Sequence, residues 1–299
     1  LSQHLLQKVK VIEFDFLKPK LVPEVFNKLE FDVAYYLLHS LADTKRDLHK
    51  FEIVCALAFI NIARLTKVQQ IIYLSGISNE DNLSPHLEGR RIVKEVMIQS
   101  GLNFTIFEAG IIVGSGSASF EIIRDLVEKL PLMIAPNWLN SKCQPIGIRN
   151  VIYYLSHCLL NEKMFCRTFE IGGPDVLTYK DMIKGYADER GYKRLIITFP
   201  VPLKRLSAYW INLVTSANLT LARQLIESMK NNAVCKENSI QEILPQKLFT
   251  YREAIALAFQ AINQNMVVSS WKDAQSSSLV QLDINDHIQV PNEGCYKDR

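Results

Sequence analysis

The residues best suited to chemistry lie between Asn103 and Phe120, in the stretch NFTIFEAGIIVGSGSASF. It begins with β-branched and aromatic residues, continues through small residues from Gly114 to Ser119, and leads into the amphipathic sequence FEIIRDLVEKL. A buried strand followed by a Gly/Ser loop and a helix start forms a ligand site in open α/β sheets, because small residues let a ligand approach backbone N–H groups. The alternative is an ordinary strand-to-helix turn, and the stretch by itself favours neither.

Glu108 and the glycine pair Gly114-x-Gly116 are the most informative residues of this stretch. An acid that ends a buried strand needs a partner or water, so Glu108 could face a substrate or be paired inside the protein. The glycine pair resembles part of a dinucleotide fingerprint, but Ser119 occupies the place of the third glycine and the turn comes late in the series of strands. We therefore reject it as a pyrophosphate loop. The sequence also contains no Gly-x-x-x-x-Gly-Lys.

Composition and charge are those of a globular protein. The 299 residues are 48% hydrophobic and 22% charged, and the net charge of +3 comes without a long basic run, which argues against a nucleic-acid partner. The longest apolar runs, such as IVCALAFI over residues 53–60, are shorter than the roughly 18 residues of a membrane span. The six cysteines form no Cys-x-x-Cys and have no histidine at metal-ligand spacing, so we expect reduced thiols in a cytoplasmic protein and no metal site.

Strands and helices alternate along the first 130 residues. Strands are expected over 9–14, 32–38, 68–74 and 103–108, and helices over 21–29, 44–64, 84–99 and 120–130. Ser84 as N-cap, Pro85 at the first helical position and Gly101 after the last turn mark the third of these helices. This alternation predicts an α/β fold, with a Rossmann-like, doubly wound parallel sheet that carries helices on both faces.

The second half continues this pattern and then changes character. We expect an extended segment over 144–148, a helix over 150–160, strands over 168–171 and 195–199, and between these strands a helix that begins at Thr178-Tyr-Lys-Asp181, a capping-box spacing. Further helices are expected over 203–230 and 250–263. The predicted organisation is a Rossmann-like domain over 1–200, a small helical lobe over 201–268, and a linker with the start of a second domain over 269–299.

Several segments in a fixed order form a recognisable pattern. They are Asp15-Phe16, DVAYYLLHS, IIYLSGIS, LSPHLEGRRIVKEV, GSGSASFEIIRDLVEKLP, CQPIGIRNV and FEIGGPDVLTYKDM. From about residue 9 to residue 299 the chain resembles the atypical short-chain dehydrogenase/reductase family, in the epimerase/NmrA-like branch whose nucleotide domain precedes a START-like ligand-binding domain. The resemblance implies truncation at both ends, without the family's first strand, Gly-rich turn and second strand and with only the opening of the START-like domain.

The catalytic pair of the wider family is missing from this chain. Enzymes of that family use Tyr-x-x-x-Lys, in which the lysine lowers the tyrosine pKa and the tyrosine exchanges a proton with the substrate. None of the 11 tyrosines has a lysine four residues later, and the matching place reads His86-Leu-Glu-Gly-Arg90. His86 could act as the acid and Arg90 could hold a ribose or phosphate, although arginine stays protonated. The more common alternative is that both are solvated residues at the start of a helix.

The resemblance also implies the remaining site residues. Ser75 stands in the place of the family's catalytic hydroxyl, although an unaided serine after a strand is more often a turn residue. The substrate would meet Glu108, Ser115 and Gln144. The cofactor would be NAD(P), with NADP expected, although the residue that reads the 2′ position should follow the absent second strand. The implied cofactor-binding residues are Asp15, Phe16, Leu38, His39, Ser40, Ser75, Arg90 and Gly110.

The leading interpretation is a cytoplasmic NAD(P)-binding oxidoreductase that moves a hydride between nicotinamide and a small carbonyl or alcohol. Turnover stays open, because the tyrosine and lysine are missing. One alternative is a nucleotide-binding sensor or assembly factor without turnover. Another is a ligand carrier that uses the second domain, with the sheet as a scaffold. The substrate and the oligomeric state also stay open.

Overall fold

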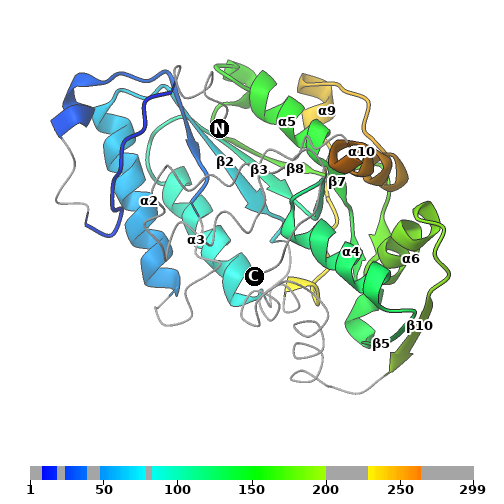
Figure 1. Cartoon of the computed structure of the whole chain (residues 1–299). Helices are drawn as coiled ribbons and strands as arrows, with labels where there is room; N and C mark the ends of the chain where they lie inside the picture. Colours follow the sequence, from blue (N-terminus) through cyan, green and yellow to red (C-terminus); the bar gives the residue numbers. More distant parts are fainter. Residues whose placement is uncertain (1–8, 19–23, 39–47, 79–82, 200–227, 264–299) are drawn as a thin grey trace, which may run out of the picture.

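A four-stranded parallel sheet organises this computed structural model, which describes residues 9–18, 24–38, 48–78, 83–199 and 228–263 (Figure 1). All three pairs of neighbouring strands are parallel. Their carboxyl ends therefore meet along one edge of the sheet, where Ser75 lies opposite Glu108. In spatial order the strands are β1 (Val33–Tyr36), β2 (Gln70–Gly76), β3 (Phe104–Ala109) and β8 (Arg167–Ile171).

Helices cover both faces of the sheet (Figure 1). On one face Ile71 and Tyr73 of β2 share a buried cluster with Val93, and on the other face Ile72 shares a cluster with Tyr154. Consecutive residues of β2 are thus buried on opposite sides, as expected for a parallel strand between two helical layers. The predicted Rossmann-like, doubly wound fold is confirmed. The first face carries α2 (Leu48–Leu65) and α3 (Pro85–Ile98), and the second carries α5 (Ile148–His157).

A second group of elements follows the carboxyl end of β3. Phe120, Tyr186 and Ile255 come from three different helices and share one buried cluster. Three short strand pairs, β4–β7, β5–β10 and β6–β9, tie this group together. Its elements are β4 (Ile112–Val113), α4 (Ala118–Lys129), β5 (Leu132–Pro136), η3 (Asn137–Asn140), β6 (Lys142–Cys143), β7 (Ile146–Gly147), β9 (Leu177–Thr178), α6 (Tyr179–Glu189), β10 (Leu195–Phe199) and α10 (Tyr251–Asn263). The remaining short helices are η2 (Glu24–Lys28), η4 (Glu162–Met164) and α9 (Ile240–Ile243).

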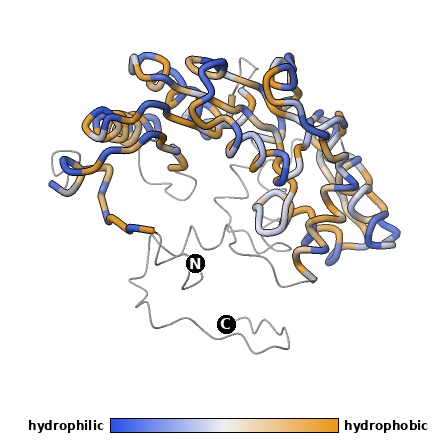
Figure 2. Tube along the Cα trace, turned by 90° about the horizontal axis from the view of Figure 1, so that it is seen from above, coloured by the Kyte–Doolittle hydropathy of each residue, from blue (hydrophilic) through white to orange (hydrophobic). Residues whose placement is uncertain are grey.

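Side-chain caps explain where the helices begin. The Ser84 hydroxyl accepts a hydrogen bond from the backbone of Leu87 at 3.3 Å, and Thr178 and Asp181 make both bonds of a capping box. Each cap satisfies a backbone N–H that has no partner within the helix. Hydrophobic and hydrophilic residues alternate along the helical turns (Figure 2), so each helix presents an apolar face to the core.

The strand predicted over residues 9–14 is wrong. Residues 9–18 form no strand, and the side chain of Val11 is 76% exposed. A strand needs a neighbour that pairs with its backbone, and among the described strands none lies on the outer edge of β1. The helix expected over 21–29 is described from residue 24, where it takes the tighter 3₁₀ form of η2.

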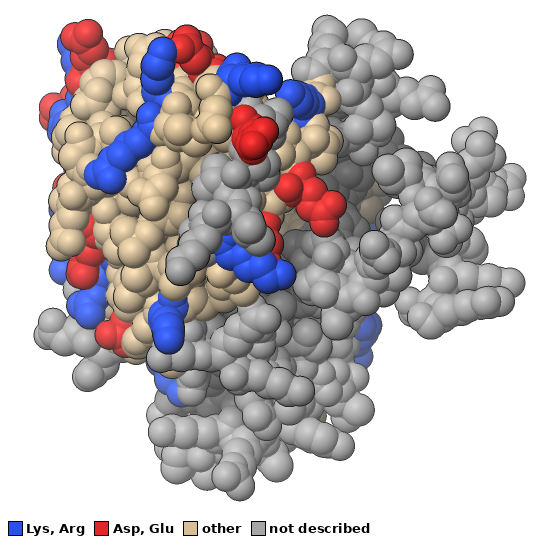
Figure 3. All heavy atoms as spheres, turned by 90° about the vertical axis from the view of Figure 1, so that its left-hand side faces the viewer, with Lys and Arg blue, Asp and Glu red and all other residues tan. Residues whose placement is uncertain are grey.

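Several predictions fall wholly or partly outside the described residues. His39 and Ser40 belong to this group, as do residues 201–227 and 264–268 of the predicted helical lobe and the segment 269–299. The division of the chain into three parts stays a prediction. Among the helices that are described, none is long and apolar enough to cross a membrane. On the face that includes α2, acidic and basic side chains are interspersed (Figure 3).

Candidate functional site

A cavity of about 400 Å³ opens where the carboxyl ends of β1, β2 and β3 meet. Leu38 and Gly110, which follow β1 and β3, and Ser75 near the end of β2 line it. The start of α3, the start of α4 and residues around 228–233 close the other sides. Ligands of open α/β sheets bind at this edge, and the volume lies within the usual range for small-molecule sites. We therefore take this cavity as the candidate site.

Helix α3 brings His86 and Arg90 to the cavity one turn apart. The Arg90 guanidinium donates to the Leu74 carbonyl at 3.1 Å, which ties α3 to the end of β2. Its Nε also donates to His86 Nε2 at 3.2 Å. Because Nε2 acts as the acceptor, the neutral imidazole carries its proton on Nδ1. Arg90 thus fixes which nitrogen of His86 can donate a proton.

Ser75 adds a hydroxyl to the floor of the cavity. It lies near the end of β2, and only 5% of the residue is exposed. Tyr73 stands two residues earlier on the same face of β2, where its hydroxyl donates to the Arg90 carbonyl at 3.5 Å, and burial raises the pKa of its phenol. Tyr73 therefore stays neutral, and the cavity-lining groups that can move a proton on this side are Ser75 and His86.

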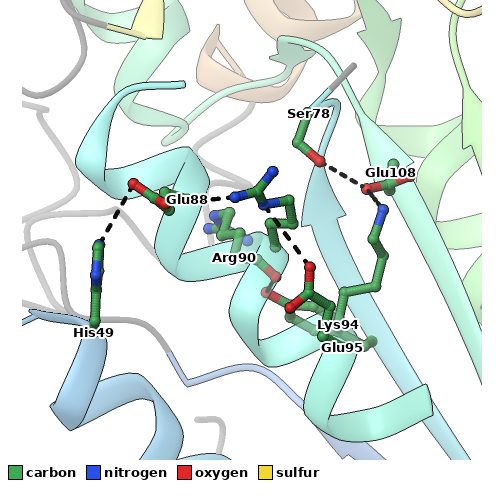
Figure 4. A network of polar contacts seen from close by, with 9 residues as sticks. His49, Ser78, Glu88, Arg90, Lys94, Glu95 and Glu108 are labelled. Atoms are coloured by element: carbon green, nitrogen blue, oxygen red, sulfur yellow. Dashed lines mark hydrogen bonds and ion pairs between the residues drawn. The ribbon is translucent and has the colours of Figure 1, made fainter. Parts of the chain in front are cut away.

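Glu108 lies on β3 next to Ser75 but turns toward α3 (Figure 4). Its carboxylate accepts hydrogen bonds from Lys94 Nζ at 2.8 Å and from the Ser78 hydroxyl at 3.2 Å. Glu108 is almost fully buried, and it is not among the residues that line the cavity. Of the two roles considered for this acid, the geometry favours the internal pair over contact with a substrate.

The start of α4 forms another wall, and two backbone donors at this helix start are bound by side chains of the same segment. The Ser117 hydroxyl accepts from the backbone of Phe120 at 3.3 Å and donates to the Ile112 carbonyl at 3.0 Å. The Glu121 carboxylate accepts from the backbone of Gly116 at 3.3 Å. The Gly/Ser loop is therefore a helix start with its own internal caps.

A segment from residue 228 to residue 235 forms the remaining wall, and Gln144 holds it in place. The Gln144 backbone donates to the Ala233 carbonyl at 2.9 Å, and its side chain accepts from the Cys235 backbone and donates to the Gly173 carbonyl. Gly110 lies under this clamp, where a Cβ atom would stand 3.1 Å and 3.2 Å from two carbonyl oxygens. Gln144 supports the wall of the cavity without lining it.

Other predicted residues lie elsewhere. Asp15 caps its own turn by accepting from the Leu17 backbone at 3.0 Å, and the ring of Phe16 packs against Phe14. Neither Asp15 nor Phe16 lines the cavity. Ser115 lines a separate cavity of about 60 Å³ beside α10. The structure thus brings together Leu38, Ser75, His86, Arg90 and Gly110 from the predicted set.

The sequence reasoning missed the apolar walls. Ile111, Ile112 and Ile122 line the cavity beside the predicted loop, and Met229 reaches it from the segment after residue 227. An apolar residue after a strand gives no signal that separates a cavity wall from the core. Met229 could not have been found at all, because its place depends on the pairing of Ala233 with Cys143.

The described residues contain no group of three or more His, Cys, Asp or Glu side chains that could hold a metal ion. The described thiols near the site are also poor nucleophiles. Burial raises the pKa of Cys143 to about 11 and that of Cys235 to about 12, so both stay protonated near neutral pH. Among the described residues the chemistry of the site therefore depends on its hydroxyl, imidazole and guanidinium groups.

Comparison with known proteins identifies the fold. No protein-family model and no curated protein sequence matches the chain. A nucleoside-diphosphate-sugar epimerase from Staphylococcus aureus matches with a TM-score of 0.64 at 13% identity, over 85% of this chain and 86% of that chain. An NADPH-dependent quinone oxidoreductase from Escherichia coli, complexed with NADPH, matches with a TM-score of 0.63 at 12% identity, over 85% of each chain. Triphenylmethane reductase from Citrobacter sp., complexed with NADP(H), matches with a TM-score of 0.64 at 14% identity, over 86% of each chain. At these identities the likeness shows a shared Rossmann-like fold.

Proposed function

We propose that the chain is an NAD(P)-binding oxidoreductase of the short-chain dehydrogenase/reductase superfamily that acts on a small carbonyl or alcohol in the cytoplasm. The observation that carries this proposal is the cavity at the carboxyl edge of the sheet, which collects Ser75, His86 and Arg90. The fold supports it, because the matching quinone oxidoreductase and triphenylmethane reductase are complexed with NADPH and NADP(H). NADP is the proposed cofactor for the same reason.

The cavity fits the nicotinamide end of such a cofactor. Its volume suits an uncharged ring with its ribose, and Arg90 and Ser75 offer donors for ribose hydroxyls. The diphosphate would extend toward Leu37 and Leu38 at the end of β1, since the start of α4 is internally capped. Among the described residues no further Lys or Arg lines the cavity. The proposed cofactor contacts of Asp15, Phe16, His39 and Ser40 rest on the resemblance alone.

The protein's part in the reaction is to position and polarise the carbonyl. The nicotinamide would supply the hydride. His86 would donate a hydrogen bond from Nδ1–H to the carbonyl oxygen of the substrate, and Arg90 holds the imidazole in the tautomer that can do so. The Ser75 hydroxyl orients the same oxygen. The proton that completes the alcohol would come from water, and in the oxidative direction it would return to water.

A nucleotide titration tests this proposal directly. We expect saturable binding of NADPH, followed by nicotinamide fluorescence, and weaker binding of NADH. Arg90→Ala should weaken binding at least tenfold, because it removes the cavity's described cation and releases His86. Arg91→Ala is the matched control, because Arg91 stands next in the same helix but pairs with Glu88 and Glu95 outside the cavity. Equal loss in both variants, or no binding to the wild type at millimolar nucleotide, would contradict the proposal.

A nucleotide-binding sensor without turnover is the second candidate. It is favoured by the missing Tyr-x-x-x-Lys and by the use of His86 Nε2 as an acceptor for Arg90. Tight NADPH binding without turnover on a broad carbonyl panel would support it. His86→Phe separates the two candidates. An enzyme that uses His86 should lose most of its kcat in this variant, whereas a sensor has no turnover to lose and keeps its nucleotide affinity. The ligand-carrier alternative would require ligand uptake by the second domain.

A further inference from the structure

We infer that the second ligand of this cavity is an uncharged, largely apolar carbonyl compound, and that the site selects against anions such as nucleoside-diphosphate sugars. This inference rests on the proposed function and names its substrate class. It starts from the wall that α4 and the segment 228–233 form, opposite His86 and Arg90. The matching structures include an epimerase of nucleotide sugars and two reductases, so the fold does not decide between these classes of substrate.

The first observation is the chemistry of this wall. Ile111, Ile112, Ile122 and Met229 line it, with Leu87 from α3 at its rim. Apolar side chains favour ligands that lose little hydration on binding, since a charged group that enters such a surface loses its water without a replacement. Methionine adapts to ligand shape, so the wall suits an aliphatic or aromatic body without a fixed pattern of hydroxyl groups.

The second observation is the state of the α4 N-terminus, which is the natural anion site of this wall. A helix N-terminus attracts anions through its unpaired N–H groups and its dipole. Here the Glu121 carboxylate accepts from the Gly116 backbone, and Ser117 caps the first turn. Glu121 is largely buried and also pairs with Arg124. The helix therefore carries its own anion, which occupies a backbone donor that a phosphate or carboxylate on the ligand would otherwise use.

The third observation is the position of the positive charge. Arg90 is the one Lys or Arg among the described residues that line the cavity, and it already binds the Leu74 carbonyl and His86 on the α3 side. The Ser84 and Ser228 hydroxyls are 2.8 Å apart and join the start of α3 to the segment that begins at residue 228. A diphosphate needs several donors at one place, and two serine hydroxyls of this wall are already bound, since Ser117 donates to the Ile112 carbonyl and Ser228 pairs with Ser84.

The test uses two ketones that differ in charge and little in size, methyl 4-acetylbenzoate and 4-acetylbenzoate. Binding to the wild-type chain is measured by calorimetry at low salt, with and without saturating NADPH, and UDP-glucose serves as the nucleotide sugar. We expect the ester to bind at least tenfold more tightly than the acid and UDP-glucose not to compete with it. Tighter binding of the acid or of UDP-glucose, or no binding of any of the three, would overturn the inference. Failure of the proposed function would be seen separately, as absence of NADPH binding or of turnover while the ester still binds.

Variants then test the role of Glu121. Glu121→Gln keeps an oxygen for the Gly116 backbone but removes the charge. The affinity for 4-acetylbenzoate should therefore rise two- to tenfold relative to the affinity for its methyl ester. Asp125→Asn is the matched control, because Asp125 is an equally buried acid one turn later that pairs with Lys129 away from the cavity. The ratio of the two affinities should stay within twofold in this control. An unchanged ratio in Glu121→Gln would overturn the argument from the helix N-terminus.

Discussion

Helix α3 carries two rows of charged side chains, and they differ in what surrounds them (Figure 4). The inner row is His86, Arg90 and Lys94, spaced by one helical turn and directed toward the sheet. Arg90 binds the end of β2, and Lys94 binds the buried Glu108 of β3. The Lys94 side chain is 21% exposed and that of Glu108 is 5% exposed. The inner row thus connects α3 to the edge of the sheet that forms the candidate site.

The outer row of α3 has the same residue types in a different environment. Glu88, Arg91 and Glu95 pair along the helix at 3.4 Å and 3.9 Å, and His49 of α2 lies 3.7 Å from Glu88 (Figure 4). The side chains of this row are between 39% and 57% exposed. Water and salt screen such pairs, so each contributes between about 0 and 1 kcal/mol. The contrast teaches that burial of the pair decides its energetic weight on this helix.

The largest expected effect is on the inner row. Lys94→Met leaves the Glu108 carboxylate buried without its cation, with the neutral Ser78 hydroxyl 3.2 Å away, so we expect the free energy of unfolding to fall by about 3 kcal/mol. The measurement is urea denaturation at neutral pH. The double variant Lys94→Met with Glu108→Leu should recover most of this loss, because no buried charge is then left unpaired. A single variant within 0.5 kcal/mol of the wild type would mean that the two rows do not differ.

A smaller effect is expected at the cap that begins the helix and so places its inner row. Ser84→Ala removes the hydroxyl that caps the Leu87 backbone and meets Ser228, and should cost about 1 kcal/mol in unfolding free energy. Ser84→Thr keeps a hydroxyl and is the matched control. If alanine and threonine give equal urea midpoints, the cap does not hold the start of α3.

Much of the fold followed from local sequence rules. Ser84 and Thr178 predicted two helix starts correctly, because a cap is a contact between residues three apart and needs no knowledge of the rest of the chain. The strand predicted over residues 9–14 failed for the opposite reason. Alternating apolar residues make a strand only where a neighbouring strand offers its backbone, and that depends on tertiary structure.

The candidate site could be predicted less completely than the fold. Ser75, His86 and Gly110 were predicted from the resemblance to a known family, and all three line the cavity at the carboxyl edge. Glu108 was placed on the correct strand, but its partner Lys94 lies 14 residues away and could not be read from spacing alone. Met229 depends on a contact between residues about 90 apart in sequence, such as that of Gln144 with Cys235.

The smallest expected effect is on the outer row, and its dependence on salt distinguishes the exposed pairs of this row from the buried pair of the inner row. Arg91→Ala removes two exposed pairs and should lower the free energy of unfolding by about 0.5 kcal/mol at low ionic strength. At 1 M salt, where the screening length is about 3 Å, this difference should vanish, whereas the loss in Lys94→Met should persist because that pair is shielded from water. The measurement is a pair of urea curves for each variant at 0.02 M and 1 M sodium chloride. A salt-independent loss in Arg91→Ala would show that the outer row also packs the helix, through the aliphatic part of the arginine. The energetic difference between the rows would then come from packing as well as from the burial of charge.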